Sequence, residues 1–167
     1  MKAKQLKANQ ATLKTQYESE GDSAVQQLRA VGKVDPANLA CEIVQPAFLS
    51  PAGLHPSSGG DGTFACPVEI MLAGWVSCAA VTLAAVANSM KIELSQATIT
   101  AVGTIDFRGT LAVSRDSPVG LTALELQFDL KTDASDELVS KLIQLTERYC
   151  VVHQTLMKPP SVTVNRI

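Results

Sequence analysis

The sequence predicts an α+β protein in which an antiparallel sheet wraps around one long buried helix, with a second, amphipathic helix beside it. Three observations support this prediction. An uncharged apolar run of helical length lies near the middle of the chain, apolar and polar residues then alternate as in strands, and a segment with an apolar stripe of helical period follows. The alternation places one face of the sheet on a core and the other in water, which is typical of antiparallel pairing.

Length and composition limit the class of protein. The 167 residues (17.7 kDa) fit one domain with a short appendage, and a hydrophobic fraction of 46% argues against intrinsic disorder. With 14 basic and 16 acidic residues the net charge is −2, so no basic surface is expected to hold a phosphate backbone. One Trp, two Tyr and four Phe are too few for a base-stacking platform. We therefore expect no nucleic-acid partner.

The amino-terminal residues 1–20 are predicted to be a helical extension to a domain at 21–167. A helix is expected over 2–18, where apolar residues recur on one stripe and Lys and Gln cover the rest. The stripe is thin, which indicates a helix that packs on the domain. Its members are Leu6, Leu13 and Tyr17.

Two strands and a long loop come next. The strands are expected at 24–34 and 39–45, because the linker between them, Asp35 to Asn38, has turn chemistry. Residues 45–67 form a loop rich in Pro and Gly, and such a length indicates a mobile or functional segment. Its glycine run lacks the Gly-Lys-Ser/Thr of a phosphate-binding loop and follows no apolar strand, so we do not expect a phosphate site.

A long helix is predicted to begin at Pro67, a residue suited to the first helical turn, with Glu69 at its positive end. The eighteen residues from Ile70 to Ala87 carry no charge and are long enough to cross a membrane. The run is rich in Ala, has no polybasic flank and precedes amphipathic strands. We therefore favour the buried helix of a soluble protein and expect no membrane partner.

The small residues of this helix form a low-profile face. Residues with short side chains recur at intervals of three and four, so that another helix can approach closely. A symmetric partner chain or another part of the same chain would satisfy the pattern. The residues are Ala73, Gly74, Ser77, Cys78 and Val81.

Period-two alternation follows the helix. Apolar and polar residues alternate over 97–107 and again over 124–131, which predicts two strands of the sheet. Leu111 and Val113 are expected to continue the sheet between them. One face of each strand is apolar, and this face is expected to lie on the long helix.

The carboxyl-terminal part predicts a second helix and a last strand. Polar residues at 133–135 supply an N-cap, and a helix is expected to run from there to about Cys150. Its apolar stripe puts Cys150 on or beside the buried face. After two consecutive prolines, Val162 and Val164 mark the last strand.

The four cysteines suggest chemistry in a reducing compartment. No signal-like apolar segment precedes them, so we expect a cytoplasmic protein with free thiols. Cys78 and Cys150 are each compatible with a buried core residue or with a reactive thiol. The roles of Cys41 and Cys66 stay open at this point.

A metal site is not predicted. Cys150 and His153 are three residues apart, but no second close pair of Cys or His residues accompanies them, and a strong zinc signature has two such pairs. We interpret His153 as a helix-end residue that bonds a carbonyl. The pattern also places no histidine as an oriented base beside Cys78, so a hydrolase is not expected.

Two motifs resemble the OsmC/Ohr family of osmotically inducible and organic hydroperoxide resistance proteins. The run from Cys66 to Cys78, with Pro67 and Glu69, is similar to the family's Asn-Pro-x-Glu…Cys helix. The run at 147–156, around Cys150, is similar to the family's second cysteine motif. The order of elements over 24–167 is also that of the family. The resemblance implies the OsmC-like fold and an intertwined dimer.

The resemblance further implies a thiol peroxidase that reduces organic hydroperoxides. Cys78 matches the attacking cysteine, which would become a sulfenic acid, and Cys150 matches the resolving cysteine, which would close a disulfide. An external dithiol would reduce that disulfide, and no cofactor is expected. The sites would lie at the subunit interface of a homodimer.

The resemblance leaves open which group ionises the attacking thiol. In the family an Arg stabilises the thiolate and a Glu holds that Arg; Glu69 matches the Glu. Glu69 lies about 13.5 Å along the helix axis from Cys78, too far for direct contact within a straight helix. The matching cation is Lys33 or Arg29, or neither, and Lys lacks the planar fork of Arg.

Two functions from other classes are alternatives. One is a non-catalytic protein of the same fold that binds a small apolar ligand or a partner. The other is a membrane-anchored protein that uses 70–87 as its span. Disulfide formation driven by peroxide would exclude the first, and solubility without detergent would exclude the second.

Overall fold

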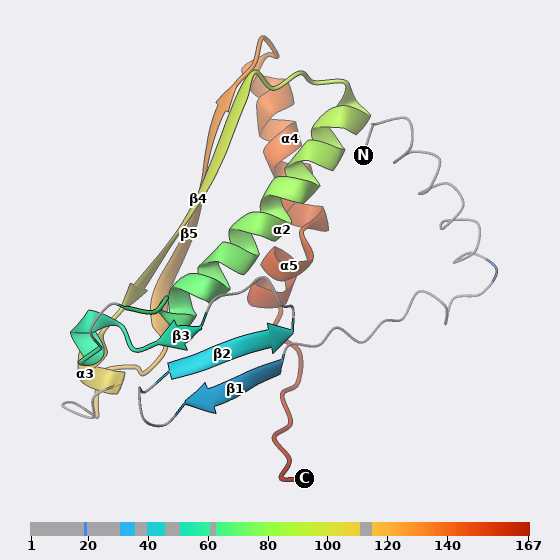
Figure 1. The fold of residues 1–167 in the computed structure, drawn as a ribbon. Helices are drawn as coiled ribbons and strands as arrows, with labels where there is room; N and C mark the ends of the chain where they lie inside the picture. Colours follow the sequence, from blue (N-terminus) through green and yellow to red (C-terminus); the bar gives the residue numbers. More distant parts are fainter. Residues whose placement is uncertain (1–18, 20–30, 36–39, 46–50, 61–62, 111–114) are drawn as a thin grey trace.

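In the residues that the structure describes, the chain forms an α+β arrangement of two antiparallel sheets and a set of helices (Figure 1). The α+β prediction is confirmed. The expected helix over 2–18 and the expected boundary after residue 20 lie outside the described residues and stay predictions. The computed structural model describes Ser19 and residues 31–35, 40–45, 51–60, 63–110 and 115–167.

The first sheet has the order β1-β2-β3 and is antiparallel throughout. Its strands are β1 (Val31–Asp35), β2 (Ala40–Gln45) and β3 (Ala52–Gly53). The strand expected at 39–45 is confirmed by β2. The strand expected at 24–34 is confirmed from residue 31 onward, and its earlier part lies outside the described residues.

The long loop between β2 and the central helix carries local structure of its own. A 3-10 turn, η2 (Pro56–Ser58), is capped by His55, whose Nδ1 accepts a hydrogen bond from the Ser57 N–H at 3.0 Å. The turn ends at Gly59, whose φ of 92° lies in the left-handed region that favours glycine. Residues 55–60 of this loop are therefore held by short-range hydrogen bonds.

The central helix, α2 (Pro67–Met90), starts where the sequence predicts and runs slightly further. The Glu69 carboxylate accepts a hydrogen bond from the Cys66 N–H at 3.3 Å, which satisfies one free donor at the start of the helix. At the other end Lys91 adopts a left-handed conformation with φ 57°. Its N–H bonds back to the last carbonyls of the helix, and the chain then turns toward the second sheet.

Only one side of α2 is buried within a single chain. The buried residues recur every fourth position and so form one stripe: Trp75, Ala79, Leu83 and Ala87. The opposite side is open, with Val81 72% exposed. The prediction of a buried helix therefore holds for this stripe and not for the whole circumference. Of the helices in the described residues, α2 alone has the length and apolar composition of a membrane span.

The second sheet is a long antiparallel ribbon that lies along α2. It consists of β4 (Gln96–Ile105) and β5 (Leu121–Lys131), paired from Gln96↔Lys131 to Ile105↔Leu121. Both strands confirm the alternation seen in the sequence. Side chains of alternate residues, such as Ile99 and Phe128, pack against α2, while their neighbours face outward.

The end of β4 differs from the prediction, which extended this strand to Phe107. The register shifts between Thr104 and Ile105, the strand ends, and Phe107 begins a short helix, α3 (Phe107–Thr110). The Phe107 ring stacks on His55 of the preceding loop, with ring centroids 5.0 Å apart. The Phe107 side chain packs on the loop that precedes α2 instead of on the face of a strand, so the alternating pattern predicted too long a strand. The predicted continuation at Leu111 and Val113 lies outside the described residues.

The second helix, α4 (Asp136–Tyr149), confirms the amphipathic helix of the prediction. Ser135 caps it, accepting a hydrogen bond from the Leu138 N–H at 3.4 Å. Leu142 and Thr146 are fully buried against α2, and the Thr146 hydroxyl donates to the Leu142 carbonyl at 2.8 Å. The one buried hydroxyl of the described core is thus satisfied within its own helix.

A further short helix, α5 (Val151–Met157), follows directly and was not predicted. The strand predicted at Val162 and Val164 is wrong: neither residue lies in a strand, and they are 83% and 91% exposed. Alternating residues become a strand only where a neighbouring edge supplies hydrogen bonds. Figure 1 shows this tail leaving α5 and ending away from the β4–β5 ribbon.

The core has two parts, both centred on the buried stripe of α2. One contains Leu83, Ala87 and Leu142 and holds α4 in place. The other contains Trp75, Ala79 and Cys150 and lies where α5 meets α2 and the ribbon. The ribbon and α4 both pack on the same buried stripe of α2, and Figure 1 shows α4 crossing α2 beside the ribbon.

Candidate active site

Two cysteines that are far apart in the sequence meet in the second part of the core. Cys78 lies on α2, and Cys150 lies at the junction of α4 and α5. The Cys78 side chain is a hydrogen-bonding neighbour of the Cys150 thiol, and both are free thiols. The fold therefore brings two reduced sulfurs together in one apolar environment.

The backbone around Cys150 explains how it reaches this place. Its own φ and ψ of −73° and 111° are extended, so the residue ends α4 and begins α5. The Cys150 N–H bonds to the Thr146 carbonyl at 2.9 Å, and the Cys150 carbonyl accepts from the Gln154 N–H at 2.9 Å. Held on both sides, Cys150 is 0% exposed.

The two thiols differ in burial. Cys78 adjoins the fully buried Ala79 in sequence but sits at the edge of the buried stripe, so it is only half-buried. Cys150 packs directly against Trp75 and Ala79. A reagent that enters from solvent would therefore meet Cys78 before Cys150.

Burial raises the pKa of the Cys150 thiol above its ordinary value, and this is the largest effect on it. The N–H groups of Val152 and His153, at the positive end of α5, act in the opposite direction. The hydrogen bond with Cys78 and negative charge on Cys78 add to the increase. The net result is a Cys150 that stays protonated near neutral pH, most strongly when Cys78 is ionised.

Of the other residues expected at the site, Glu69 alone has a described side chain, and its carboxylate bonds away from the two thiols. Glu69 is exposed and its carboxylate caps the start of α2 at Cys66, which is 8% exposed. Lys33 lies in β1, in register with Glu42 of β2, and its side chain is not described. Arg29 lies outside the described residues. The cation that the resemblance requires thus remains unassigned.

Two residues that the sequence reasoning did not select lie beside the thiols. Trp75 is 5% exposed and packs against Cys150, and its ring faces that of His153 with centroids 5.9 Å apart. The Trp75 Nε1 and the His153 Nδ1 are both buried, and neither has a hydrogen-bond partner among the described residues. His153 was interpreted as bonding a carbonyl, and its Nδ1 makes no such bond there. The available signal was spacing: each residue is three positions from a cysteine.

The described side chains contain no group of three or more His, Cys, Asp or Glu residues arranged to hold a metal ion. The thiol pair has acid–base and redox chemistry of its own. Two adjacent thiols can be oxidised to a disulfide, and a thiolate can attack an electrophile.

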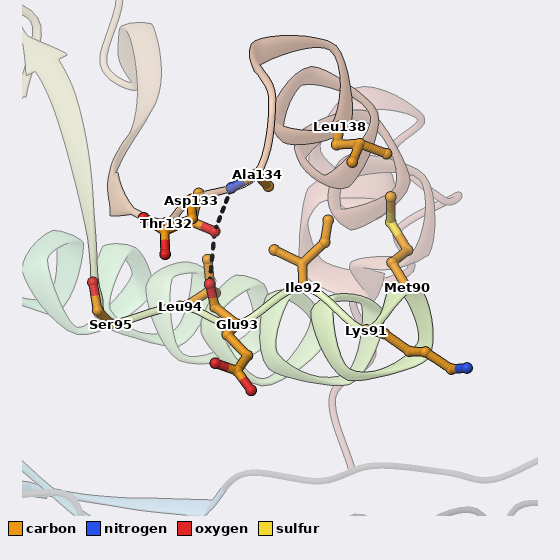
Figure 2. Close-up of a pocket in the computed structure, with 10 residues that line it drawn as sticks. All are labelled: Met90, Lys91, Ile92, Glu93, Leu94, Ser95, Thr132, Asp133, Ala134 and Leu138. Atoms are coloured by element: carbon orange, nitrogen blue, oxygen red, sulfur yellow. Dashed lines mark hydrogen bonds between the residues drawn. The ribbon is translucent and has the colours of Figure 1, made fainter.

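A separate pocket lies at the far end of α2 and is shown in Figure 2. Its volume is about 680 Å³, and Thr132 spans it by donating to the Glu93 carbonyl at 2.6 Å and accepting from the Ala134 N–H at 3.2 Å. Met90 follows Cys78 by twelve residues, roughly 18 Å along a helix axis, so the pocket is distant from the thiols. It is lined by Met90, Lys91, Ile92, Glu93, Leu94, Ser95, Thr132, Asp133, Ala134 and Leu138.

The sequence model of the family described as OsmC-like protein matches residues 60–165, which include both cysteines and every helix from α2 to α5. The chain belongs to the OsmC-like family. No curated protein matches the sequence. Membership of the family was anticipated from the two cysteine motifs and is confirmed.

Solved OsmC-like structures share the fold at low sequence identity. An OsmC-like protein from Mycoplasma pneumoniae has a TM-score of 0.67 at 16% identity, covering 80% of this chain and 89% of that chain. An organic hydroperoxide resistance protein from Elizabethkingia anophelis has a TM-score of 0.63 at 18% identity, covering 80% and 91%. An organic hydroperoxide resistance protein OsmC from Legionella pneumophila has a TM-score of 0.58 at 15% identity, covering 80% and 93%. At such identities the likeness establishes the fold alone.

Proposed function

We propose that this OsmC-like protein is a cytoplasmic thiol peroxidase that reduces organic hydroperoxides. The observation that carries the proposal is the meeting of Cys78 and Cys150 as free thiols in an apolar part of the core. Family membership and the organic hydroperoxide resistance proteins among the solved structures support the same chemistry.

The proposed cycle has three steps. The Cys78 thiolate attacks the terminal oxygen of the hydroperoxide, the O–O bond breaks, and the alkoxide takes a proton and leaves as an alcohol. The Cys150 sulfur then attacks the Cys78 sulfenic acid, forming the disulfide and releasing water. An external dithiol reduces the disulfide and restores both thiols. No cofactor or metal takes part.

Differences between the thiols support this order of attack. Cys78 is half-buried at the edge of the cluster, where a substrate can approach. Cys150 is fully enclosed and its raised pKa keeps it protonated, so it is poorly suited to attack a peroxide from solvent. A buried thiol in contact with the first is suited to resolving the oxidised form.

The surroundings favour an alkyl substrate. Apolar side chains from α2, the ribbon and α5 pack around the thiols, so the organic part of a hydroperoxide would gain by leaving water. Hydrogen peroxide would gain nothing comparable. The residues are Leu72, Ile99, Ala101, Leu126, Val152 and Leu156.

We also propose that the working form is a homodimer joined through the open side of α2, with the sites at the interface. A Cβ built on Gly74 would meet nothing within 4 Å, so packing inside the chain does not require this glycine. Val81 is 72% exposed on the same small-residue face. A second copy would cover this face, and Arg29 or Lys33 is the candidate to stabilise the Cys78 thiolate there.

The test is oxidation of the reduced protein by cumene hydroperoxide, followed by mass spectrometry of the disulfides. We expect a Cys78–Cys150 disulfide in proportion to added peroxide, its loss in Cys78→Ser, and its retention in the control Cys66→Ser. If no peroxide-dependent disulfide forms, or if Cys78→Ser leaves it unchanged, the proposal fails. The alternative of a non-catalytic binding protein of this fold would then be preferred.

A further inference from the structure

His153 lies close to Cys150 at the start of α5. It is the third residue of α5, and Cys150 is the N-cap of that helix, a pair of positions whose groups can reach each other. Its backbone N–H faces the Cys150 sulfur, and its ring lies against Trp75, which itself packs on Cys150. Trp75 therefore contacts both the His153 ring and the Cys150 side chain.

The His153 Nδ1 is buried and has no hydrogen-bond partner in the described part of the chain. A buried polar atom without a partner is costly, and most such atoms are paired. Contact with the Trp75 ring limits how the imidazole can turn. The arrangement leaves a nitrogen base unoccupied against Trp75, the residue that also packs on Cys150, with no hydrogen bond between the His153 Nδ1 and the Cys150 thiol in the reduced protein.

Resolution of the oxidised enzyme creates a need for such a base. Cys150 attacks as a thiolate, yet burial holds it protonated. Among the described groups that enclose the thiol, α2 contributes the titratable Cys78, and the ribbon contributes apolar Ile99, Ala101 and Leu126. Cys78 is a sulfenic acid at this step, so its sulfur is no longer a thiolate that could act as the base. An imidazole in its neutral form can.

We propose that His153 accepts the proton of the Cys150 thiol as that thiol attacks the oxidised Cys78. The inference rests on the proposed function and deepens it by assigning the proton of the resolving step. The Cys150 sulfur forms the S–S bond, the S–O bond of the Cys78 sulfenic acid breaks, and the departing hydroxide takes the proton from His153 as water. His153 returns to its neutral form, so no further reactant is consumed.

The experiment isolates the attack of Cys150 without a peroxide. In a Cys41→Ser, Cys66→Ser background, dithiobisnitrobenzoate reacts with Cys78 and releases one coloured thiolate; attack by Cys150 on the mixed disulfide releases a second. The aromatic thiolate needs no proton to leave, so the second phase reports deprotonation of Cys150. Stopped-flow absorbance follows both phases across a pH series.

In His153→Gln we expect the first phase to be unchanged and the second to be slower by about a hundredfold near pH 7, within the range of general-base effects. The difference should close at alkaline pH, where Cys150 ionises without help. Imidazole in solution should restore the second phase in His153→Ala. The control His55→Gln alters the other histidine of the chain, which stacks on Phe107, and should behave as the parent.

The inference is overturned if His153→Gln leaves the second phase within twofold at every pH. It is equally overturned if the second phase slows by one constant factor at all pH values, because that pattern is structural. Failure of the proposed function shows separately, as an absence of Cys78 sulfenic acid after hydroperoxide treatment of Cys150→Ser, in which no resolving thiol removes it. The aromatic disulfide assay still decides the role of His153 in that case.

Discussion

At the residue scale, one sulfur atom is held by the meeting of two helices. Cys150 closes α4 and opens α5, and Trp75 and Ala79 of α2 pack over it. Desolvation and the neighbouring Cys78 raise its pKa, while two amides at the start of α5 moderate the increase. The same residue is thereby both a core side chain and a protonated thiol beside a more accessible one.

Replacing the buried thiol should separate oxidation from resolution. In Cys150→Ser, we expect Cys78 still to react with cumene hydroperoxide and its sulfenic acid to persist, because no second thiol lies beside it. Trapping with dimedone and mass spectrometry should find the adduct on Cys78, with multiple turnovers reduced by at least about tenfold when a dithiol is the reductant. Equal turnover in Cys150→Ser and wild type would contradict the assigned role.

The raised pKa of Cys150 also predicts how stability depends on pH. Below the ordinary thiol value of 9.0 the group is protonated in both the folded and the unfolded chain, so its stabilising contribution is fully present. As pH rises above 9.0 the unfolded chain ionises first, and the contribution is lost progressively up to the raised folded value.

Urea denaturation of the reduced protein at a series of pH values measures this effect. Wild type should lose more stability between neutral and alkaline pH than Cys150→Ala, in which the titrating group is absent. Ionisable groups that do not interact with Cys150 contribute equally to both proteins and cancel in the difference. If the free energies of unfolding of the two proteins changed in parallel with pH, burial would not raise the pKa of the Cys150 thiol as described.

At the element scale, α2 owes its place to a stripe of four buried residues, and α4 is fastened to that stripe chiefly by Leu142. Leu142 is 0% exposed and packs with Leu83 and Ala87. Its position fixes the line of α4, and hence where the chain turns at Cys150. Packing some turns away from the thiols therefore contributes to bringing them together.

Leu142→Ala should destabilise the protein by about 2–5 kcal/mol, because it removes buried methyl groups and leaves a cavity. Leu138→Ala on the same helix is the matched control; Leu138 is 46% exposed, and its loss should cost less than about 1 kcal/mol. Urea unfolding followed by circular dichroism measures both. Similar losses for the two variants would show that α4 is not held by this contact.

At the scale of the whole molecule, one chain leaves a long apolar helix covered on one side only. Of the eighteen-residue apolar window of α2, 22% is buried. Small side chains and Val81 on the open side are better suited to a close helix contact than to exposure in water. This asymmetry is the physical basis for the proposed dimer.

A charge on that face should dissociate the dimer. Val81→Asp would place an unpaired carboxylate in the interface, and we expect the dimer dissociation constant to rise by at least about tenfold. The control Val119→Asp changes a residue 67% exposed that precedes β5 and should leave the dimer intact. Sedimentation velocity decides between them. A wild-type monomer, or a Val81→Asp dimer of unchanged affinity, would contradict the proposal.

The local sequence pattern determined those elements that depend on neighbouring residues and on a continuous apolar stripe. The start of α2 at Pro67, the cap of α4 at Ser135 and the alternation of β5 depend on neighbouring residues, and each could be predicted. Cys78 and Cys150 were identified from motif resemblance. Pattern failed at Phe107 and Val162, where alternation alone cannot tell whether another strand edge is available.

Only the tertiary structure decided what surrounds the thiols. Burial of Cys150, its contact with Cys78, and the pairing of Trp75 with His153 depend on how α4 and α5 cross α2. Sequence spacing places each residue on its own helix, but a pKa and an unpaired nitrogen depend on desolvation by other elements. Residues with reactive side chains could thus be identified from the sequence, while the environment of those side chains is decided by the fold.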